Sequence, residues 1–566
     1  MTRSGNNSWQ FAPAWREAWR NYTRADFAKD LGAGLTVGVI ALPLAIGFGI
    51  ASGVTPGQGL WTAIVAGFLI SALGGSRFQI GGPTGAFVPV LASIVAAHGY
   101  GGLALATMMA GAILVVLGAF RLGVLLRFIP YPVVAGFTSG IAVIIFTAQL
   151  NEALGLGLKM PEYVPQQLAL LGAHLRAVHW HALAISALTL AIFYGWPRVT
   201  RKVPPSIVAV VATTVLAAAL GWPVATIGSK FGGIPAGLPG WHFPEISLER
   251  LRELAGAAAT IAALGGIESL LSAAVADGMT DTRHDSNQEL LGQGLANLLT
   301  PLIGGIAATG AIARTAANIR SGGRSPAAGM IHALVLLAVA LVAAPLAKYI
   351  PLATLSAILI TVAVRMAEWD TFLELWRGPR TDFGVLIATF LLTVIFDLTV
   401  GVGAGLAMAV VLFVRHMEEM AHVKLLTPES DVEMEGSNSL RGKSVPPGVV
   451  LYRIQGPLFF AVADKLEAAL RASGGRPRIV VFRMRHVPTM DATGLHAFEI
   501  AVEKMQRDHV RVLLTAVQPQ PMKVMFTAGL VDRIGIENIC ANIDEALARC
   551  SRLLDGESIS PPPADQ

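Results

Sequence analysis

The sequence predicts a polytopic α-helical membrane protein with a smaller α/β domain at its carboxyl end. Only 14% of the 566 residues are charged, against roughly 25% in soluble globular proteins, and the mean hydropathy is +0.60. Apolar segments of membrane-spanning character recur as far as residue 415. From about residue 420, short β-rich runs alternate with amphipathic stretches, which is typical of an α/β domain.

The chain begins with a basic segment, residues 1–30, that contains no apolar core of a cleavable signal. We therefore expect a cytoplasmic amino-terminal segment followed by a retained first membrane helix. The membrane domain is predicted over 31–420, a linker over 421–445, the α/β domain over 446–556 and a disordered tail over 557–566. Fourteen apolar segments are predicted to be helices: 31–53, 59–74, 83–98, 102–120, 125–150, 180–196, 204–221, 255–276, 288–304, 310–320, 327–347, 351–366, 382–397 and 399–415.

Basic residues predict the orientation of these helices. If both termini are cytoplasmic, 17 Lys and Arg residues fall on the inside and 6 on the outside. This bias agrees with the positive-inside rule, and the reversed orientation would invert it. We therefore expect a multi-pass protein of a bacterial inner membrane with both termini in the cytoplasm.

Two short matches indicate an internal repeat. The triplets that begin at Gly53 and Gly278 are 225 residues apart, and so are the Thr-Gly-Ala triplets that begin at Thr84 and Thr309. Seven helices per half is an odd number, so the halves must have opposite topology. The sequence thus predicts a seven-plus-seven inverted repeat; coincidental Gly-Thr turns in a large membrane protein are the alternative.

The two Thr-Gly-Ala triplets open short helices, the third and the tenth. A helix that starts inside the membrane presents free N–H groups and the positive end of its dipole, which suits an anion. The alternative is that both breaks are kinks that only serve packing. The candidate anion-binding positions at these starts are Thr84, Gly85, Ala86, Ile312, Ala313 and Arg314.

Two ionisable residues fall within apolar segments, where a charge is costly. Arg314 lies near the start of the tenth helix and would place a positive charge beside an anion; a structural ion pair or a snorkelling side chain is the alternative. Glu268 is the acid deep in the eighth segment and would either bind a cation or carry a proton, with Ser272 four residues on and on the same helix face. Pairing of Glu268 with Arg314 as structural glue is compatible with both roles.

Several classes of function are disfavoured. Two cysteines cannot build a disulfide framework or a tetrahedral zinc site, and no phosphate-binding loop or nucleophile elbow occurs. The charges lie mostly at the ends and in short loops, so a nucleic-acid partner is a poor interpretation. We expect no cofactor, no metal and no enzymatic activity.

The α/β domain contains one notable motif. A β-rich run at 478–482 leads to Asp491 and Thr493, which would lie at the amino terminus of an amphipathic helix. Capping of that helix is the simpler interpretation. Phosphorylation of Thr493 is the alternative.

Residues 25–556 resemble the SulP family of anion transporters, whose fourteen-helix core shares the fold of uracil permeases and ends in a STAS domain. The resemblance rests on Leu42-Pro43 with Phe48, Gly81 to Ala86, Glu268 to Leu271, Asp277 to Thr280, and Ala313-Arg314-Thr315.

The resemblance implies roles for particular positions. The family's anion site maps onto Phe48, Thr84 and the start of the tenth helix at Ile312, Ala313 and Arg314, and its coupling carboxylate maps onto Glu268. Many sulfate and chloride members have Gln at the position of Leu44. Sodium-coupled bicarbonate members have Asp at the position of Glu268 and Thr at that of Ile312. These departures favour a proton over sodium as the coupling ion.

Within the family, the sequence segments 74–78 and 265–271 are most similar to those of the bacterial branch that carries C4-dicarboxylates such as succinate and fumarate. We therefore expect a proton-coupled, alternating-access transporter in which helices 1–4 and 8–11 move against helices 5–7 and 12–14. Sulfate or bicarbonate transport or exchange, an anion channel, a nucleobase permease and a STAS-based sensor stay open. The resemblance also implies contact with membrane lipid, a homodimer and a cytoplasmic partner of the STAS domain.

Overall fold

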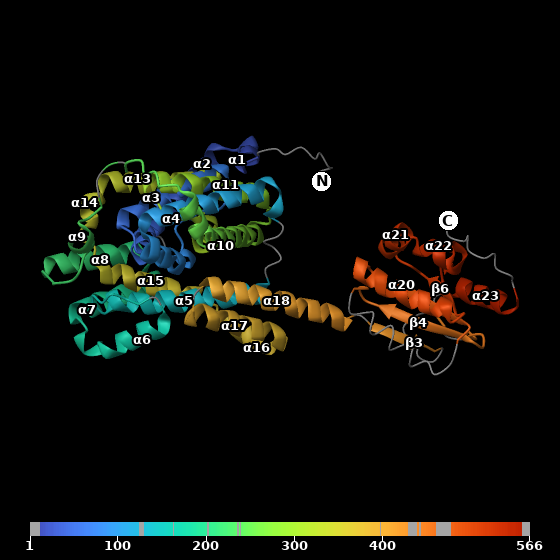
Figure 1. The fold of residues 1–566 in the computed structure, drawn as a ribbon. Coiled ribbons are helices and arrows are strands. Elements are labelled where there is room, and N and C mark those ends of the chain that lie inside the picture. Colours follow the sequence, from blue (N-terminus) through green and yellow to red (C-terminus); the bar gives the residue numbers. More distant parts are fainter. Residues whose placement is uncertain are drawn as a thin grey trace. The chain divides into compact units, whose positions relative to one another are not determined.

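The computed structural model describes residues 12–123, 130–161, 163–200, 203–234, 237, 239–396, 398–420, 422–427, 439–440, 443–459 and 477–556. The chain forms two compact units, Met1–Ala409 and Val410–Gln566, and each is described by itself (Figure 1). The expected disordered tail at 557–566 lies outside the described residues, as do residues 1–11 of the expected amino-terminal segment.

Each of the fourteen apolar segments contains helical structure among its described residues. Seven helices are long and apolar enough to cross a membrane within the described ranges, and three more are apolar but shorter. The helices of the first unit are α1 (Trp15–Ala18), α2 (Arg24–Ala51), α3 (Pro56–Leu73), α4 (Val88–Ala119), α5 (Tyr131–Ala153), α6 (Val164–Ala173), α7 (Trp180–Val199), α8 (Pro205–Ala219), α9 (Ile227–Phe231), α10 (Leu248–Thr280), α11 (Ser286–Leu299), α12 (Ile312–Arg320), α13 (Pro326–Val342), α14 (Ala344–Ala347), α15 (Leu352–Met366), α16 (Trp369–Arg377) and α17 (Arg380–Ile395), with α18 (Leu398–Met420) crossing into the second.

Several helix boundaries differ from the expected ones, and two of the differences have clear local reasons. Helix α2 begins at Arg24 rather than near residue 31, because Thr23 and Asp26 form a capping box that starts the helix among polar residues. The predicted segments 83–98 and 102–120 merge in α4, which begins at Val88 after a 3₁₀ helix at Gly85–Phe87 and breaks at Gly99, where φ is +67°. Glycine tolerates this left-handed conformation, so two helical segments follow one another there.

The helices of the first unit pack as two groups. Helices α2, α3 and α4 pack against α10, α11, α12 and α13, while α5 packs against α15 and α17, and α7 against α8 and α15. Contacts of α2 with α8 and α15 connect the groups. Where α3 leads to α4 and α11 leads to α12, strands β1 (Gly81–Gly82) and β2 (Thr309–Gly310) pair antiparallel. The two segments that lead to the helix starts thus run antiparallel, as a two-fold inverted repeat predicts.

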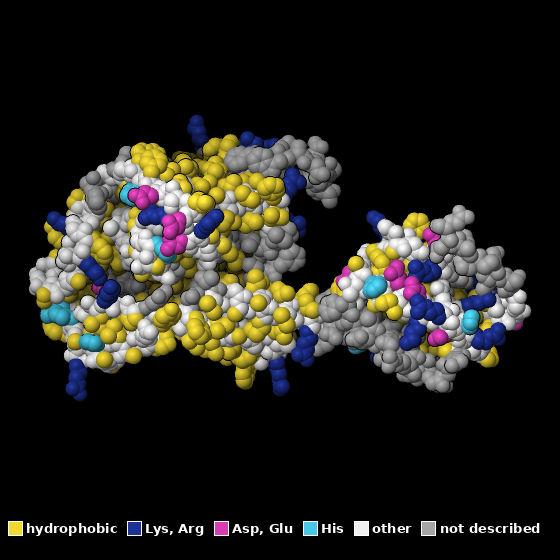
Figure 2. All heavy atoms as spheres, in the orientation of Figure 1, with side chains coloured by type: hydrophobic (Ala, Val, Ile, Leu, Met, Phe, Trp, Pro, Cys, Tyr) yellow, Lys and Arg dark blue, Asp and Glu magenta, His cyan; other side chains and the backbone are white. Residues whose placement is uncertain are grey.

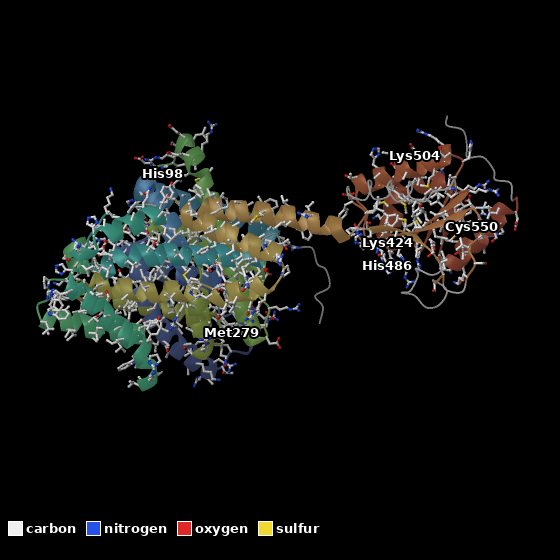
Figure 3. The ribbon with its side chains drawn as sticks, turned by 90° about the horizontal axis from the view of Figure 1, so that it is seen from below. His98, Met279, Lys424, His486, Lys504 and Cys550 are labelled. Atoms are coloured by element: carbon white, nitrogen blue, oxygen red, sulfur yellow. The ribbon has the colours of Figure 1, made fainter. Side chains whose placement is uncertain are left out.

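The second unit is a five-stranded sheet with helices on both faces. The strand order is β3-β4-β5-β6-β7, antiparallel between β3 and β4 and parallel between the others. One buried cluster joins the sheet to α20, α21 and α22, and another joins its other face to α23, which carries Cys550 (Figure 3). The bounds are β3 (His422–Leu426), β4 (Val449–Gln455), β5 (Ile479–His486), β6 (Arg511–Thr515), β7 (Ile539–Cys540), α20 (Ala492–Arg507), α21 (Pro519–Thr527), α22 (Leu530–Ile534) and α23 (Ile543–Leu554).

Strand β3 lies inside the range 421–445, which we expected to be a linker. Its five residues are mostly exposed and too few to show a clear alternation, so only pairing with β4 defines the strand. The surfaces of the two units also differ in composition. Figure 2 shows mainly hydrophobic side chains on the helical unit and dispersed charged side chains on the sheet unit.

Candidate anion site at the paired helix breaks

The β1–β2 ribbon joins the two breaks. Gly81 pairs with Gly310 and Gly82 with Thr309, and the Ala311 amide donates to the Ile80 carbonyl at 2.9 Å. The short 3₁₀ helix Gly85–Phe87, which leads into α4, and helix α12 start just after the ribbon. Their first amides have no carbonyl of a preceding helical turn to bind. Two helix starts are thus held together, as an anion site between broken helices requires.

Arg314 reaches across from the second break to the first. Arg314 is 3% exposed, and its guanidinium donates to the Pro83 carbonyl at 2.6 Å and to the Gly81 carbonyl at 3.4 Å. Gly82 has φ +143°, and a methyl group there would lie 2.6 Å from Nη1 of Arg314. The first break therefore needs glycine both for its backbone and for the close approach of the guanidinium.

Glu268 lies at the first break. The Thr84 hydroxyl donates to Oε2 of Glu268 at 2.8 Å, and Glu268 as a residue is half-buried. No ion pair shorter than 4.0 Å joins Glu268 to Arg314 in the described part of the chain, where each has its own partner at the first break. The structure thus brings an acid and a buried cation to the same break without pairing them directly.

The remaining predicted anion-binding positions surround the breaks. Phe48 is buried, and its Cε1 atom would be 3.4 Å from a methyl group placed on Gly85. Ala86 is also buried, whereas Ile312 is 41% exposed and Ala313 is exposed. The start of α12 is therefore the exposed side of the candidate site, whereas Phe48 and Ala86 are buried beside the first break.

Ser272 has a different neighbour from the one we expected. It is fully buried, and its hydroxyl donates to Oγ1 of Thr315 at 3.1 Å, while the Ile80 amide donates to the same oxygen at 3.0 Å. No hydrogen bond joins Ser272 to Glu268 in the described structure. Ser272 thus helps to tie α10 and α12 to the segment before β1, which positions the ribbon.

A polar stripe on α11 also supports both breaks, and we did not single it out in the sequence. Glu289 accepts hydrogen bonds from the Gly75, Ser76, Gln79 and Gln293 N–H groups at 2.9–3.1 Å. Gln79 in turn donates to the Ser269 carbonyl, beside Glu268.

The same stripe reaches the second break through Asn297. Its amide donates to the Ala308 carbonyl and accepts from the Ala308 amide, both at 2.8 Å. Glu289, Gln293 and Asn297 are four residues apart and buried on one helix face. Polar residues at intervals of four within an apolar segment were the sequence feature from which this stripe could have been predicted.

In the second unit, the predicted cap is present. Oδ1 of Asp491 accepts from the Gly494 amide at 2.7 Å, so Asp491 caps α20. Thr493 lies in the first turn of that helix and is exposed, and no hydrogen bond of its side chain occurs among the described residues. Its accessibility is compatible with modification, whereas a capping role belongs to Asp491.

Two broken helices that meet in an inverted repeat define the class of polytopic membrane transporters. The chain belongs to the sulfate permease family: the model of the Sulfate permease family matches residues 27–389, and that of the STAS domain matches residues 443–546. The protein is therefore a multi-pass anion transporter of the SulP family and not an enzyme.

Curated relatives support this assignment. The chain is 41% identical over 530 residues to "Putative sulfate transporter YvdB" of Bacillus subtilis (strain 168), covering 93% of this chain and 98% of the relative. It is 34% identical over 521 residues to the bicarbonate transporter BicA of Picosynechococcus sp. (strain ATCC 27264 / PCC 7002 / PR-6), covering 90% and 92%. These relatives are named for sulfate and bicarbonate, so they do not bear out the expected similarity to the C4-dicarboxylate branch.

Solved structures confirm the fold. The transmembrane domain of a cyanobacterial BicA is 35% identical, has a TM-score of 0.61, and covers 69% of this chain and 98% of its own length. The SLC26A9 structure has a TM-score of 0.84 and covers 94% of this chain and 92% of its own. It is only 17% identical, so it supports the fold alone. The predicted fold class, a helical membrane domain followed by STAS, is confirmed.

Proposed function

We propose that the protein is a secondary transporter that moves a small oxyanion by alternating access, with Glu268 carrying a coupling proton. One observation carries this proposal: the Thr84 hydroxyl, at the opening of the first break, donates to the Glu268 carboxylate at 2.8 Å. A titratable group is thereby linked to the backbone segment that faces the second helix start.

The coupling follows from charge. An ionised Glu268 repels an anion held at the helix starts, and a protonated Glu268 does not. Proton and anion therefore favour each other's binding, and this coupling is reciprocal. Arg314 supplies the positive charge, while its bonds to the Pro83 and Gly81 carbonyls keep the guanidinium at the break.

We propose sulfate or bicarbonate as the substrate, in line with the named relatives, ahead of a C4-dicarboxylate. The sequence segments that resemble the dicarboxylate branch have packing partners here. The amides of Gly75 and Ser76 bind Glu289, and the Gly265 carbonyl accepts from Thr309. These contacts give Gly75, Ser76 and Gly265 a packing role, so their presence does not by itself favour a dicarboxylate.

The setting of the transporter follows the sequence expectations. We place it in the bacterial inner membrane with both termini in the cytoplasm, since the basic loops are biased to that side. A homodimer and a cytoplasmic partner of the STAS domain complete the proposal. Phosphorylation of the exposed Thr493 would be one means of controlling such a partner.

The test is uptake of labelled sulfate, bicarbonate and succinate into proteoliposomes without sodium, with and without an inward proton gradient. We expect the gradient to raise uptake of sulfate or bicarbonate. In Glu268→Gln, anion binding should remain while the response to the gradient is lost. Glu249→Gln, at the exposed start of the same helix, is the matched control and should behave like the wild type.

Two outcomes would contradict the proposal. Accumulation that still follows the gradient in Glu268→Gln would remove the proton role from this residue. Uptake of succinate alone would retain the architecture and overturn the substrate assignment.

A further inference from the structure

Helix α16 is a separate short helix between α15 and α17. The backbone leaves helical geometry at Ala367 and Glu368, where ψ is 105° and 63°, so α16 does not continue α15. Its first turn is fixed to α5: the Tyr131 and Thr371 hydroxyls lie 2.8 Å apart, and Thr371 donates to Oε2 of Glu368 at 3.1 Å. Helix α16 is therefore held in place at its start.

One side of α16 packs on the protein. Thr371 is buried, Phe372 and Leu375 are half-buried, and the ring of Phe372 meets that of Phe390 on α17 at 5.5 Å between centroids. Beyond this sector, the ring of Trp376 also meets that of Phe383 on α17 edge-on at 5.0 Å between centroids, yet Trp376 stays largely exposed in this unit.

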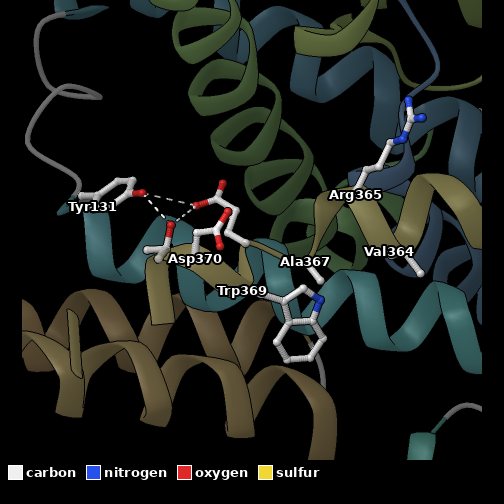
Figure 4. Close-up of a pocket in the computed structure, with 8 residues that line it drawn as sticks. Tyr131, Val364, Arg365, Ala367, Trp369 and Asp370 are labelled. Carbon is white, nitrogen blue, oxygen red and sulfur yellow. Dashed lines mark hydrogen bonds between the residues drawn. The ribbon is translucent and has the colours of Figure 1, made fainter. Parts of the chain in front are cut away.

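The open part of α16 has an apolar sector and a polar sector. Trp369, Leu373 and Trp376 are 59%, 61% and 71% exposed. At about 100° per residue, they share an arc of about 60°. The other exposed side chains of the helix are polar and lie on the adjoining sector: Asp370, Glu374 and Arg377. Figure 4 shows Trp369 directed away from Tyr131 and Asp370, in agreement with this division.

The position of α16 and its residue types indicate what covers the apolar sector. The candidate membrane span Leu352–Arg377 contains α15 and, beyond the break at Ala367 and Glu368, α16, which leads directly to the apolar helix α17. Tryptophan is enriched at the boundary between the acyl chains and the headgroups, because its ring is apolar and its N–H is polar. Exposed Arg377 and Arg380 at the carboxyl end of α16 and the start of α17 complement anionic headgroups.

We propose that α16 is an interfacial helix that lies in the surface of the lipid bilayer. Its apolar sector, Trp369, Leu373 and Trp376, enters the boundary of the acyl chains, and its polar sector faces water. Arg377 and Arg380 meet the phosphates of anionic phospholipids. Because α16 is bonded to α5 and packed on α17, it anchors this group of helices to one leaflet.

The experiment measures whether the apolar and the polar sector of α16 are each in contact with lipid or with water. Single cysteines are placed at Leu373 and Trp376 on the apolar sector, and at Asp370 and Glu374 on the polar sector as matched controls. Each full-length variant is spin-labelled in vesicles of phosphatidylethanolamine and phosphatidylglycerol. The two native cysteines, Cys540 and Cys550, are buried, and burial raises the pKa of the Cys550 thiol to about 12, so native labelling stays low.

Collisions of the label with oxygen and with a water-soluble nickel chelate are then compared. We expect oxygen to dominate at 373 and 376, and the chelate to dominate at 370 and 374. Replacing phosphatidylglycerol by phosphatidylcholine should reduce the contrast, and Arg377→Gln with Arg380→Gln should remove this lipid dependence.

If something other than lipid covers the apolar sector, the two reagents reach the labels differently. Labels at 373 and 376 that reach neither reagent would show a protein surface, either the STAS unit or a second copy, over the apolar sector. Labels that favour the chelate at all four positions would show a helix in water. Either result overturns the proposal, and a contrast that does not depend on anionic lipid overturns the role of the two arginines.

Discussion

The two halves of the inverted repeat make the same ribbon but carry different charges. Glu268 and Arg314 both belong to the second half, and the positions 225 residues earlier are Pro43 and Pro89. The first half supplies the Pro83 and Gly81 carbonyls that receive Arg314. Each half thus contributes a helix start to the candidate site, but only the second half contributes its two ionisable side chains.

The equivalent threonines show the same division. Thr84 donates to the Glu268 carboxylate, whereas Thr309 donates to the Gly265 carbonyl on the same helix, α10. One bond links a titratable group to a break, and the other holds a break to a helix. From this difference we expect Thr84 to act in the proposed coupling and Thr309 in positioning, and the following substitutions test that expectation.

The largest effect is expected from Arg314→Gln. The change removes the buried charge and leaves the carbonyls at the first break without their donor, a loss of about 3 kcal/mol, or roughly a hundredfold in anion affinity. Anion binding and uptake in proteoliposomes check this. Arg320→Gln, at the exposed end of the same helix, should stay near wild type. Retained affinity in Arg314→Gln would show that the helix starts alone hold the anion.

Glu289→Gln should rank second. The amide offers one acceptor oxygen to four N–H donors, so the loop that leads to β1 loosens at a cost of about 2 kcal/mol. We expect a KM about ten times higher, a smaller change in kcat and a lower Tm. Glu253→Gln, at the surface of α10, is the control. A lower Tm with unchanged KM would restrict Glu289 to folding.

The pair Thr84→Val and Thr309→Val tests the comparison directly. Each removes one hydrogen bond worth about 1 kcal/mol, or roughly fivefold. Thr84→Val should shift the dependence of uptake on the proton gradient, because Glu268 loses its donor. Thr309→Val should lower the rate of uptake and leave its dependence on the proton gradient unchanged. Identical gradient profiles in both variants would contradict the separation of roles.

Pro89→Ala should have the smallest effect. Pro89 lies in the first turn of α4, where proline fits without strain, and its loss changes stability by at most about 1 kcal/mol. Uptake should stay within about twofold of wild type. A loss as large as that of Arg314→Gln would show that both halves contribute chemistry at this repeat position.

Most of the fold could be predicted because its signals are local. Apolar runs, glycine breaks and the change of composition near residue 420 are visible without knowing any partner. Strand β3 and helix α16 are short, and the hydropathy of so few residues does not predict them. Pairing with β4 defines the strand, and packing on α17 supports the helix. Both were absent from the expectations for that reason.

The site was predicted in part. Thr84, Arg314 and Glu268 stand out because a helix start or a charge in an apolar segment is unusual wherever it folds. That Arg314 binds the carbonyls of the first break, and that Ser272 binds Thr315 and not Glu268, depends on segments more than 40 residues apart in the chain.

The sequence by itself determined the membrane class, the order of the helices, the repeat and the types of residue available at each break. These properties follow from hydropathy and spacing, which act over one helix or one turn. Only the tertiary structure decided the partners: the antiparallel ribbon, the reach of Arg314 and the polar stripe on α11 that supports both breaks. Hydrogen bonds act over about 3 Å, so their partners are settled only when distant segments pack together.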